Sequence, residues 1–600
     1  MRCNTFFWPA LLFLSLPALA QLIPAGQPVP RTAKPPVIFV NGYQTLCGSG
    51  STFESTFGIA DQVLQANGEV SVFFDNCSVP DKPSIEKLGA AFGAFLAGLK
   101  YTDGTPVGVV DVVAHSMGGL IVRSYLSGKQ DQVSAFAPPG TTETRKLIFL
   151  ATPQFGTPLA NLPLGQVQLD ELSSGSNFLW DLNTWTDNTD DLRGVDAIAV
   201  IGSGGTGELS GSQPGFDDGV VTLTSASLGF YQPGRTRVLP VCHVEAGGLV
   251  TLVQLCPDNA KGVARIHSAS DDSARIIVSF LNGTGEWKSI GQAAEENNLL
   301  ANAGGLYARP FSGTGDPMKL NSGTVTGQGT SKNLQQSNDQ IGFLDFFPAG
   351  QVTLSLDTSA GTMTRTTTLR RATDQAITVK PGPIVNRVLT AAAALFPYTF
   401  APRSIVSIYG ESLAAGTVTA GTLPLPTMLS DAQVLAGDTA LPLFYVSALQ
   451  INAALPDNVS GLVKLTVKNG SGAHTVNLLI EPARPAIFTT NGVGTGLAAA
   501  IRWNNGGAVS ASNPLRAGDF VELFVSGLGA LTASGNANQI PTVTLVGANC
   551  PVTYAGAAPG FTGLDQINCQ IPGGLGANPA ATLTVSAGGR TSNPATLVLE

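Results

Sequence analysis

The chain has 600 residues, of which 12% are charged and 43% are hydrophobic, and its net charge is -9. This length exceeds what one hydrophobic core usually supports, so we expect several domains. The few Lys and Arg residues form no basic stripe that could neutralise phosphates, which excludes nucleic acid as an expected partner.

The first residues have the pattern of a secretory signal. Arg2 precedes an apolar run from Phe6 to Leu16, and the small-residue segment Ala18–Ala20 favours cleavage before Gln21. The run is too short to cross a bilayer, and no later stretch reaches the roughly 18 consecutive apolar residues that a transmembrane helix needs. We therefore expect residues 1–20 to be a signal peptide, and the mature protein to be secreted or to lie at the cell surface or in the periplasm.

Short β-branched runs alternate with longer helix-like segments from Pro35 to about Gly283. This alternation indicates parallel strands joined by crossover helices, so the expected fold class is α/β over residues 35–283. Apolar residues recur on one face of two expected helices, Ser84–Lys100 and Ser268–Leu281. The expected strands are Val37–Val40, Val70–Phe74, Val109–Val113, Leu147–Ala151, Ala197–Ile201 and Arg237–Val241.

One of these strands runs into the segment Ala114-His115-Ser116-Met117-Gly118 and then into a helix-like stretch. A serine hydroxyl becomes a good nucleophile where a sharp strand-to-helix turn exposes it to a base and to backbone N–H groups. Neighbouring strands crowd such a turn, so the residues two before and two after the serine must be tiny, as Ala114 and Gly118 are. We predict that Ser116 is a nucleophile; the alternative is an accidental turn in a chain with 70 glycines.

The chain has four histidines that could serve as its base: His115, His243, His267 and His474. His115 lies beside the serine within the turn and His474 lies in the β-rich tail, which leaves two candidates. In α/β hydrolases the chain order is serine, acid, histidine, with the histidine after the last strand. His243 directly follows the last expected strand and is favoured, whereas His267 begins the last expected helix and stays the competitor.

Asp218 is the expected acid. It precedes the apolar pair Val220-Val221, which places a carboxylate at the edge of a buried segment, where it could fix the imidazole tautomer. Asp-Gly is also a turn signal, so a purely structural role is the alternative, and Asp217 is the second choice for the acid. The expected oxyanion donors are the backbone N–H groups of Tyr43 and Met117. We expect no metal and no organic cofactor.

Of the seven cysteines, Cys3 falls in the signal segment and six remain. Because a secreted protein meets an oxidising compartment, neighbouring cysteines are expected to form three local disulfides. The pairs are Cys47 with Cys77, Cys242 with Cys256, and Cys550 with Cys569. A metal site is disfavoured because the chain has no C-x-x-C motif and no histidine at zinc-finger spacing.

The segment Leu162–Trp185 is rich in large apolar residues. Two interpretations stay open for it: a lid or acyl-chain wall over the site, or ordinary amphipathic helices that cover the sheet.

Past Trp287 the sequence is dominated by Gly, Thr, Ser and Val, with strand-length runs between turn signals, which predicts β-sandwich modules. Pro381-Gly382-Pro383 is the expected linker after a module at residues 290–382. The segment Val406–Leu413 is echoed by Val521–Leu528, which indicates two related C-terminal modules, 383–488 and 489–600.

Four motifs connect the N-terminal part to known proteins: Asn41-Gly42-Tyr43, Ala114–Gly119, Ala151–Pro158 and Asp218–Val221. On these motifs the first 250 residues resemble secreted lipases and esterases of the α/β-hydrolase family, in particular triacylglycerol lipases and the GPI inositol-deacylase-like group. Asn41 stands where such lipases commonly have His, and Ala114 replaces the usual Gly. The resemblance implies a small-molecule or lipid ester as substrate.

The tail also has recognisable segments: Ala401–Gly410, Leu443–Ser447, Pro485–Phe488 and Ser526–Gly529. On these it resembles a C-terminal β-rich domain family of large secreted bacterial proteins. The resemblance implies immunoglobulin-like accessory modules, suited to contact with a cell surface or a polymer, and no chemistry.

Together these patterns predict a secreted serine hydrolase that cleaves carboxylic esters through Ser116, His243 and Asp218, and that acts as a monomer. An acyltransferase or amidase of the same fold is one alternative. A non-catalytic surface adhesion protein built on a hydrolase scaffold is the other.

Overall fold

A computed structural model describes residues 22–24, 26–44, 47, 53–161, 166–186, 192–208, 214–245, 255–395 and 398–600. The expected signal peptide at residues 1–20 and the start of the apolar segment, residues 162–165, lie outside this part of the chain. Within it, no helix has the length and apolar character to cross a membrane.

The N-terminal part is built on one seven-stranded sheet with the order β2-β1-β3-β4-β5-β6-β7. Its strands are β1 (Val37–Val40), β2 (Ser71–Phe74), β3 (Val110–His115), β4 (Thr144–Leu150), β5 (Asp196–Gly202), β6 (Thr236–Leu239) and β7 (Gln292–Ala293). The first six are parallel; β1 has the bounds that the sequence predicted, and each of the other five matches an expected strand with one or both ends shifted by one to three residues. The short β7 pairs antiparallel with β6, so the sheet continues past residue 283 into the range expected for the first β module.

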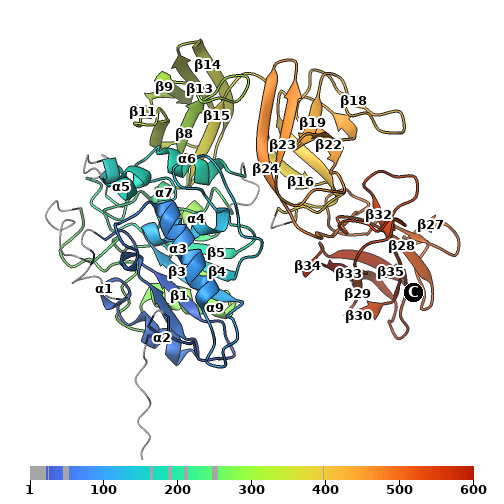
Figure 1. Cartoon of the computed structure of the whole chain (residues 1–600), viewed down its shortest axis with the longest axis horizontal. Coiled ribbons are helices and arrows are strands. Elements are labelled where there is room, and N and C mark those ends of the chain that lie inside the picture. The colour runs from blue at the N-terminus through green and yellow to red at the C-terminus, as the bar shows by residue number, and fades with distance from the viewer. Residues whose placement is uncertain are drawn as a thin grey trace, which may run out of the picture.

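Helices cover both faces of this sheet (Figure 1). The α-helices of this part are α1 (Phe53–Phe57), α2 (Ala60–Ala66), α3 (Ile85–Gly98), α4 (Met117–Ser127), α5 (Val167–Leu172), α6 (Asn177–Thr184), α7 (Leu223–Ala226) and α9 (Asp272–Asn282). In β1, Ile38 and Val40 belong to the apolar cluster of α3 and α4, whereas Val37 and Phe39 belong to that of α1, α2 and α9. Burial on both faces explains the continuous apolar strands, and the expected α/β fold class is confirmed.

A region of paired β-sheets follows, as expected. The first pair has the orders β10-β9-β13-β14 and β11-β12-β8-β15. Its strands are β8 (Ala303–Pro310), β9 (Leu320–Gly327), β10 (Thr330–Asn333), β11 (Gln335–Gln336), β12 (Gly342–Pro348), β13 (Gly350–Thr358), β14 (Gly361–Leu369) and β15 (Asp374–Val379). In Figure 1 this pair lies over the end of the α/β part that carries α6 and α7.

The second pair has the orders β16-β17-β22-β21-β18 and β20-β19-β23-β24. Its strands are β16 (Ile384–Thr390), β17 (Ile405–Glu411), β18 (Val418–Thr419), β19 (Gln433–Ala436), β20 (Thr439–Ala440), β21 (Leu443–Val446), β22 (Gln450–Ala454), β23 (Gly461–Asn469) and β24 (Gly472–Ile480). It lies beside the first pair, and the third pair lies against it (Figure 1).

The third pair is built around β27-β26-β28-β32-β31 and β30-β29-β33-β34. Its strands are β25 (Ala486–Ile487), β26 (Ala500–Arg502), β27 (Gly507–Ala508), β28 (Phe520–Ser526), β29 (Thr542–Leu545), β30 (Ala548–Cys550), β31 (Val552–Ala557), β32 (Asp565–Gln570), β33 (Asn578–Ala587), β34 (Arg590–Thr591) and β35 (Ala595–Leu599). The echoed segments form β17 and β28, whose residues Val406, Ile408, Val521 and Leu523 are fully buried.

The first pair of sheets shares a hydrophobic core with the α/β part. Tyr307 of β8 and Phe343 of β12 belong to the same apolar cluster as α3 and α4. The Tyr307 ring stacks 5.3 Å from Phe155 and 5.7 Å from Phe343. These two regions therefore pack as one body.

Two of the three expected disulfides are present, Cys47–Cys77 and Cys242–Cys256. The third is not formed. Cys550 and Cys569 are buried neighbours whose sulfur atoms lie 2.7 Å apart as free thiols, and the Cys550 thiol also lies 3.0 Å from the carbonyl oxygen of Gln570.

Candidate active site

Ser116 sits on the sharp turn between β3 and α4. Its backbone is strained, with φ of 56° and ψ of -131°. A Cβ added to Gly118 would lie 2.5 Å from the carbonyl oxygen of Val40, and one added to Gly42 would lie 2.6 Å from Cβ of Ser116. Only glycine fits at these two positions. For Gly118 this agrees with the predicted need for a tiny residue two positions after the serine; the same need at Gly42 was not predicted.

His243 lies next to the serine, in the loop that follows β6. Its Nε2 atom is 2.9 Å from the Ser116 hydroxyl oxygen, and its Nδ1 atom is 2.8 Å from Oδ2 of Asp218. The His243 side chain is only 5% exposed and that of Asp218 only 1%. The structure thus brings the predicted nucleophile, base and acid into one hydrogen-bonded chain.

The backbone fixes the Asp218 carboxylate. Its Oδ1 atom accepts the N–H groups of Val220 at 3.0 Å and Val221 at 2.7 Å, and its own carbonyl accepts the N–H of His243 at 2.8 Å. The neighbouring Asp217 instead accepts the N–H of Gly219 at 3.0 Å and caps the turn. Of the two candidate acids, Asp218 is therefore the one that faces the imidazole.

The other candidate histidines lie elsewhere or face away. The ring of His267 is 45% exposed and contacts the Glu245 carboxylate. Nδ1 of His474 accepts the N–H of Val385 at 2.7 Å, between two strands of the second pair of sheets.

His115 contacts the backbone of His243. Its Nε2–H donates to the carbonyl oxygen of His243 at 3.2 Å, and the two rings lie 4.9 Å apart. Burial, followed by the neighbouring His243, lowers the pKa of His115 to about 3. The His115 ring is therefore neutral at ordinary pH and adds no positive charge beside the base.

The loop after β1 places Gly42 against Ser116, and Tyr43 is the next residue in the chain. The backbone N–H groups of Tyr43 and Met117 have no acceptor among the described residues. Such free N–H groups next to a nucleophile are suited to stabilise an oxyanion.

The sequence reasoning missed the polar residues that hold this loop. Asn41 donates from Nδ2 to Oδ1 of Asp75 at 2.9 Å and accepts the N–H of Asn76 at 2.9 Å. Asn76 in turn donates to the carbonyl of Gly42 at 2.6 Å, next to the disulfide-bonded Cys77. The one signal in the sequence was Asn41 itself, which stands where comparable lipases have His.

One protein-family model matches part of this chain. The model of the class 2 lipase family matches residues 90–198, which include β3, Ser116 and α4. The match supports a lipolytic hydrolase. The comparison with curated proteins found no significant match.

Several solved structures are similar to this chain. Phospholipase PlaB from Legionella pneumophila is 16% identical with a TM-score of 0.42, over 58% of this chain and 93% of that chain. The mature lipase BlEst2 from Bacillus licheniformis is 24% identical with a TM-score of 0.25, over 35% of this chain and 86% of that chain. EstA from Clostridium botulinum is 13% identical with a TM-score of 0.20, over 29% of this chain and 61% of that chain.

The described part of the apolar segment forms α5 and α6. Apolar side chains of both helices are buried in the cluster shared with the sheet, among them Leu172, Phe178 and Leu182. One polar contact joins this segment to the site: the Tyr43 hydroxyl donates to Oε1 of Gln166 at 2.6 Å. The segment is a packed wall beside the site, which fits both interpretations of its sequence.

The described residues include no group of three or more His, Cys, Asp or Glu side chains that could hold a metal ion.

Proposed function

We propose that the protein is a secreted serine hydrolase that cleaves carboxylic esters. Ser116 is the nucleophile, His243 the general base and Asp218 the residue that orients it. The observation that carries this proposal is the pair of hydrogen bonds, 2.9 Å and 2.8 Å long, that joins the three side chains.

The environment of Asp218 decides which ring nitrogen of His243 carries the proton. Oδ1 of the carboxylate is already saturated by two backbone N–H groups, so Oδ2 faces Nδ1 as an acceptor. Nδ1 must therefore carry the hydrogen, which leaves Nε2 free to accept the proton of the Ser116 hydroxyl.

The reaction then follows from this tautomer. The Ser116 oxygen attacks the ester carbonyl while Nε2 of His243 takes its proton, and the resulting oxyanion accepts hydrogen bonds from the N–H groups of Tyr43 and Met117. The tetrahedral intermediate collapses, and the imidazolium gives its proton to the departing alcohol. Water repeats the sequence on the acyl enzyme and releases the carboxylic acid.

Two features support secretion. Residues 1–20 have the charge and hydropathy pattern of a signal peptide. The two disulfide bonds require an oxidising compartment in which to persist. The immunoglobulin-like character expected for the C-terminal modules suits them to contact with a cell surface or polymer.

A fluorophosphonate probe tests the proposal because it labels activated serines covalently. We expect the purified protein to be labelled and the Ser116→Ala variant to lose the label. The control is Ser331→Ala, which changes an exposed serine on β10 and should keep labelling. A wild-type protein that takes no label would contradict the proposal.

A second experiment separates ester cleavage from the other reactions of such a triad. We expect turnover of p-nitrophenyl butyrate to exceed that of the p-nitroanilide with the same acyl group, and free acid to form even with a competing alcohol present. A series of acyl chain lengths then defines the substrate class. Dominant anilide cleavage or acyl transfer would contradict an esterase.

A further inference from the structure

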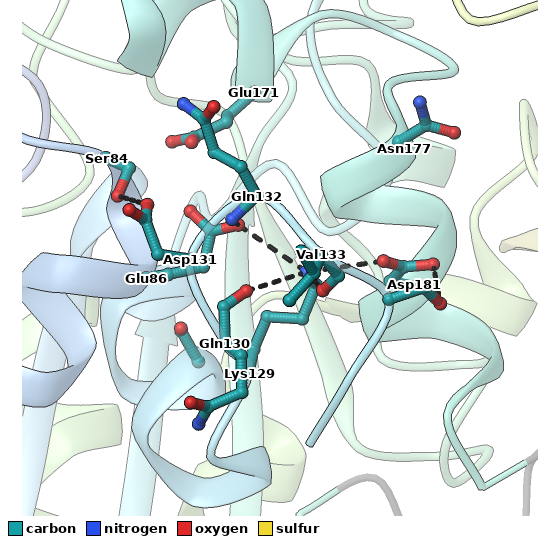
Figure 2. A network of polar contacts seen from close by, with 12 residues as sticks. Ser84, Glu86, Lys129, Gln130, Asp131, Gln132, Val133, Glu171, Asn177 and Asp181 are labelled. Atoms are coloured by element: carbon teal, nitrogen blue, oxygen red, sulfur yellow. Dashed lines mark hydrogen bonds and ion pairs between the residues drawn. The ribbon is translucent and has the colours of Figure 1, made fainter. Parts of the chain in front are cut away.

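Glu171 lies at the end of α5, in a buried polar network (Figure 2). The residue is 7% exposed. Its Oε2 atom accepts the N–H of Ile85, the first residue of α3, at 2.7 Å. This contact joins α5 to the positive end of the α3 helix dipole.

A second carboxylate, Glu86, lies beside Glu171 and is 4% exposed. Oε1 of Glu171 and Oε2 of Glu86 are both buried and accept no hydrogen bond from the donors of the described residues. Two buried carboxylates can lie together when they share a proton. Burial, followed by the charge of Glu86 and a side-chain hydrogen bond with it, raises the pKa of Glu171 to about 9.

The surrounding charges indicate which of the two carries the proton. Lys129 lies 3.6 Å from Oε1 of Glu86 and 3.3 Å from Asp181 of α6, so Glu86 has a cation beside it. Figure 2 shows the Lys129 ammonium between these two carboxylates. Glu171 makes no ion pair with a cation of the described residues, so the proton belongs on Glu171. The other charged groups around the network are Lys87 and Asp131, which pair with each other, Asp170 on α5, and Arg309, which faces Asp181.

The other end of α5 reaches the candidate site. Gln166, the residue before α5, accepts the Tyr43 hydroxyl at 2.6 Å. Gln168 donates to the carbonyl oxygen of Pro83 at 2.8 Å, just before α3. The helix is therefore held against the first residue of α3 at Glu171 and against the segment before α3 at Gln168, and the preceding residue Gln166 contacts Tyr43.

We propose that Glu171 is a positioning residue: it donates a hydrogen bond to Glu86 and thereby fixes α5, so that Gln166 keeps Tyr43 beside Ser116. This inference rests on the proposed function, in which the Tyr43 N–H is an oxyanion donor. Removal of the proton places two adjacent negative charges in the interior. The repulsion between them separates α5 from α3 and releases Tyr43.

The pH dependence of kcat/KM with p-nitrophenyl butyrate tests this role. For the wild type we expect a loss of about tenfold from pH 8 to pH 10, because the protonated fraction falls by that factor across a pKa near 9. Glu171→Gln keeps the shape but cannot titrate, so its profile should stay flat over this range. Asp170→Asn, a change of the neighbouring carboxylate on α5, should follow the wild type.

The link to Tyr43 has its own test. Gln166→Leu removes the acceptor of the Tyr43 hydroxyl. Because an oxyanion donor acts in the transition state, we expect this variant at pH 7 to lower kcat by a larger factor than the factor by which KM changes. Unchanged kcat in this variant, or a Glu171→Gln profile that overlays the wild type, would overturn the proposal.

A readout without catalysis separates this inference from the proposed function. Trp180 lies on α6, which packs against α5. In the Ser116→Ala background we expect the tryptophan emission to change between pH 8 and pH 10, and the change to vanish with Glu171→Gln or Trp180→Phe. If the emission changes in this background and the wild-type protein has no esterase activity, the proposed function is refuted while the titrating contact stays supported. Emission that does not change with pH would overturn the contact itself.

Discussion

The α/β part and the C-terminal β modules bury their side chains in different ways. In the α/β part, buried polar groups form connected chains, such as Ser116–His243–Asp218 and Asp181–Lys129–Glu86. In β28 of the last module, the buried residues Val521, Leu523 and Val525 alternate with more exposed ones. The polar chain Ser116–His243–Asp218 consists of the groups proposed for catalysis, whereas the alternation in β28 buries apolar surface in a sheet without a proposed chemical role. Substitutions should therefore change chemistry in the first region and stability in the second.

The largest effect should come from the base. We expect His243→Ala to lower kcat/KM with p-nitrophenyl butyrate by roughly 10⁴- to 10⁶-fold, because it removes the ring nitrogen that lies 2.9 Å from the serine hydroxyl. His267→Ala removes an exposed ring paired with Glu245 and should change kcat/KM by less than about threefold, as surface substitutions usually have small effects. A larger loss in His267→Ala than in His243→Ala would reverse the assignment of the base.

The acid should come next. Asp218→Asn keeps the shape of the side chain but favours the wrong imidazole tautomer, which typically lowers kcat by about 10⁴-fold. Asp217→Asn is the matched control one residue away and should retain most of the activity, provided that circular dichroism shows an intact fold. Equal losses in the two variants would indicate that the turn, and not the carboxylate, is what matters.

The disulfide beside the base should affect both stability and chemistry. Cys242 directly precedes His243, and its partner Cys256 lies 14 residues further along the chain. Replacement of both cysteines by Ser should lower the free energy of unfolding by about 3 kcal/mol. It should also lower kcat/KM by roughly 10- to 100-fold, since a small displacement of a catalytic group has effects of this size. Urea unfolding and steady-state kinetics measure the two effects, and Cys550→Ala in the last module should leave the kinetics unchanged.

Because the His115 ring is neutral in the folded protein, the free energy of unfolding should fall in acid. The unfolded chain binds a proton at His115 near pH 6.5, whereas burial lowers the pKa in the folded protein to about 3. The unfolded state therefore binds more protons between these values, and stability falls as the pH drops below about 6.5. His115→Gln should remove roughly 2 kcal/mol of the stability difference between pH 7.5 and pH 5. Urea unfolding at both pH values checks this, and parallel pH dependences in the two proteins would contradict it.

The smallest effect on chemistry should come from the core of the last module. Leu523 is fully buried in β28, so Leu523→Ala should lower the free energy of unfolding by about 2 to 5 kcal/mol. We expect its kcat/KM below the unfolding transition to equal that of the wild type. A clear loss of activity would show that this module supports the site, and the contrast between the two regions would fail.

The sequence was informative wherever the chemistry imposes a local pattern. The strained turn at Ser116 needs a small residue at Gly118, two positions away, so a short motif contains this part of the requirement; Gly42 also has to be glycine, but it lies in a distant loop. The α/β fold could be predicted for the same reason, because strands buried on both faces are continuously apolar. The choice between His243 and His267 depended on chain order alone, and only the structure shows which ring lies beside the serine.

Other features could not be predicted because they join distant segments. Glu86 and Glu171 meet across two helices, and no local pattern relates them. The two-residue strand Gln292–Ala293 is too short to produce an alternating pattern, so the sequence did not predict that the sheet continues past residue 283.

The aromatic stack of Phe155, Tyr307 and Phe343 has a consequence for any shortened version of the protein. A fragment that ends with α9 would lack Tyr307 and Phe343 and would leave this side of Phe155 exposed to water. Such an uncovered apolar patch promotes aggregation. The shortest fragment that keeps these apolar side chains buried should instead run to Val379, at the end of β15.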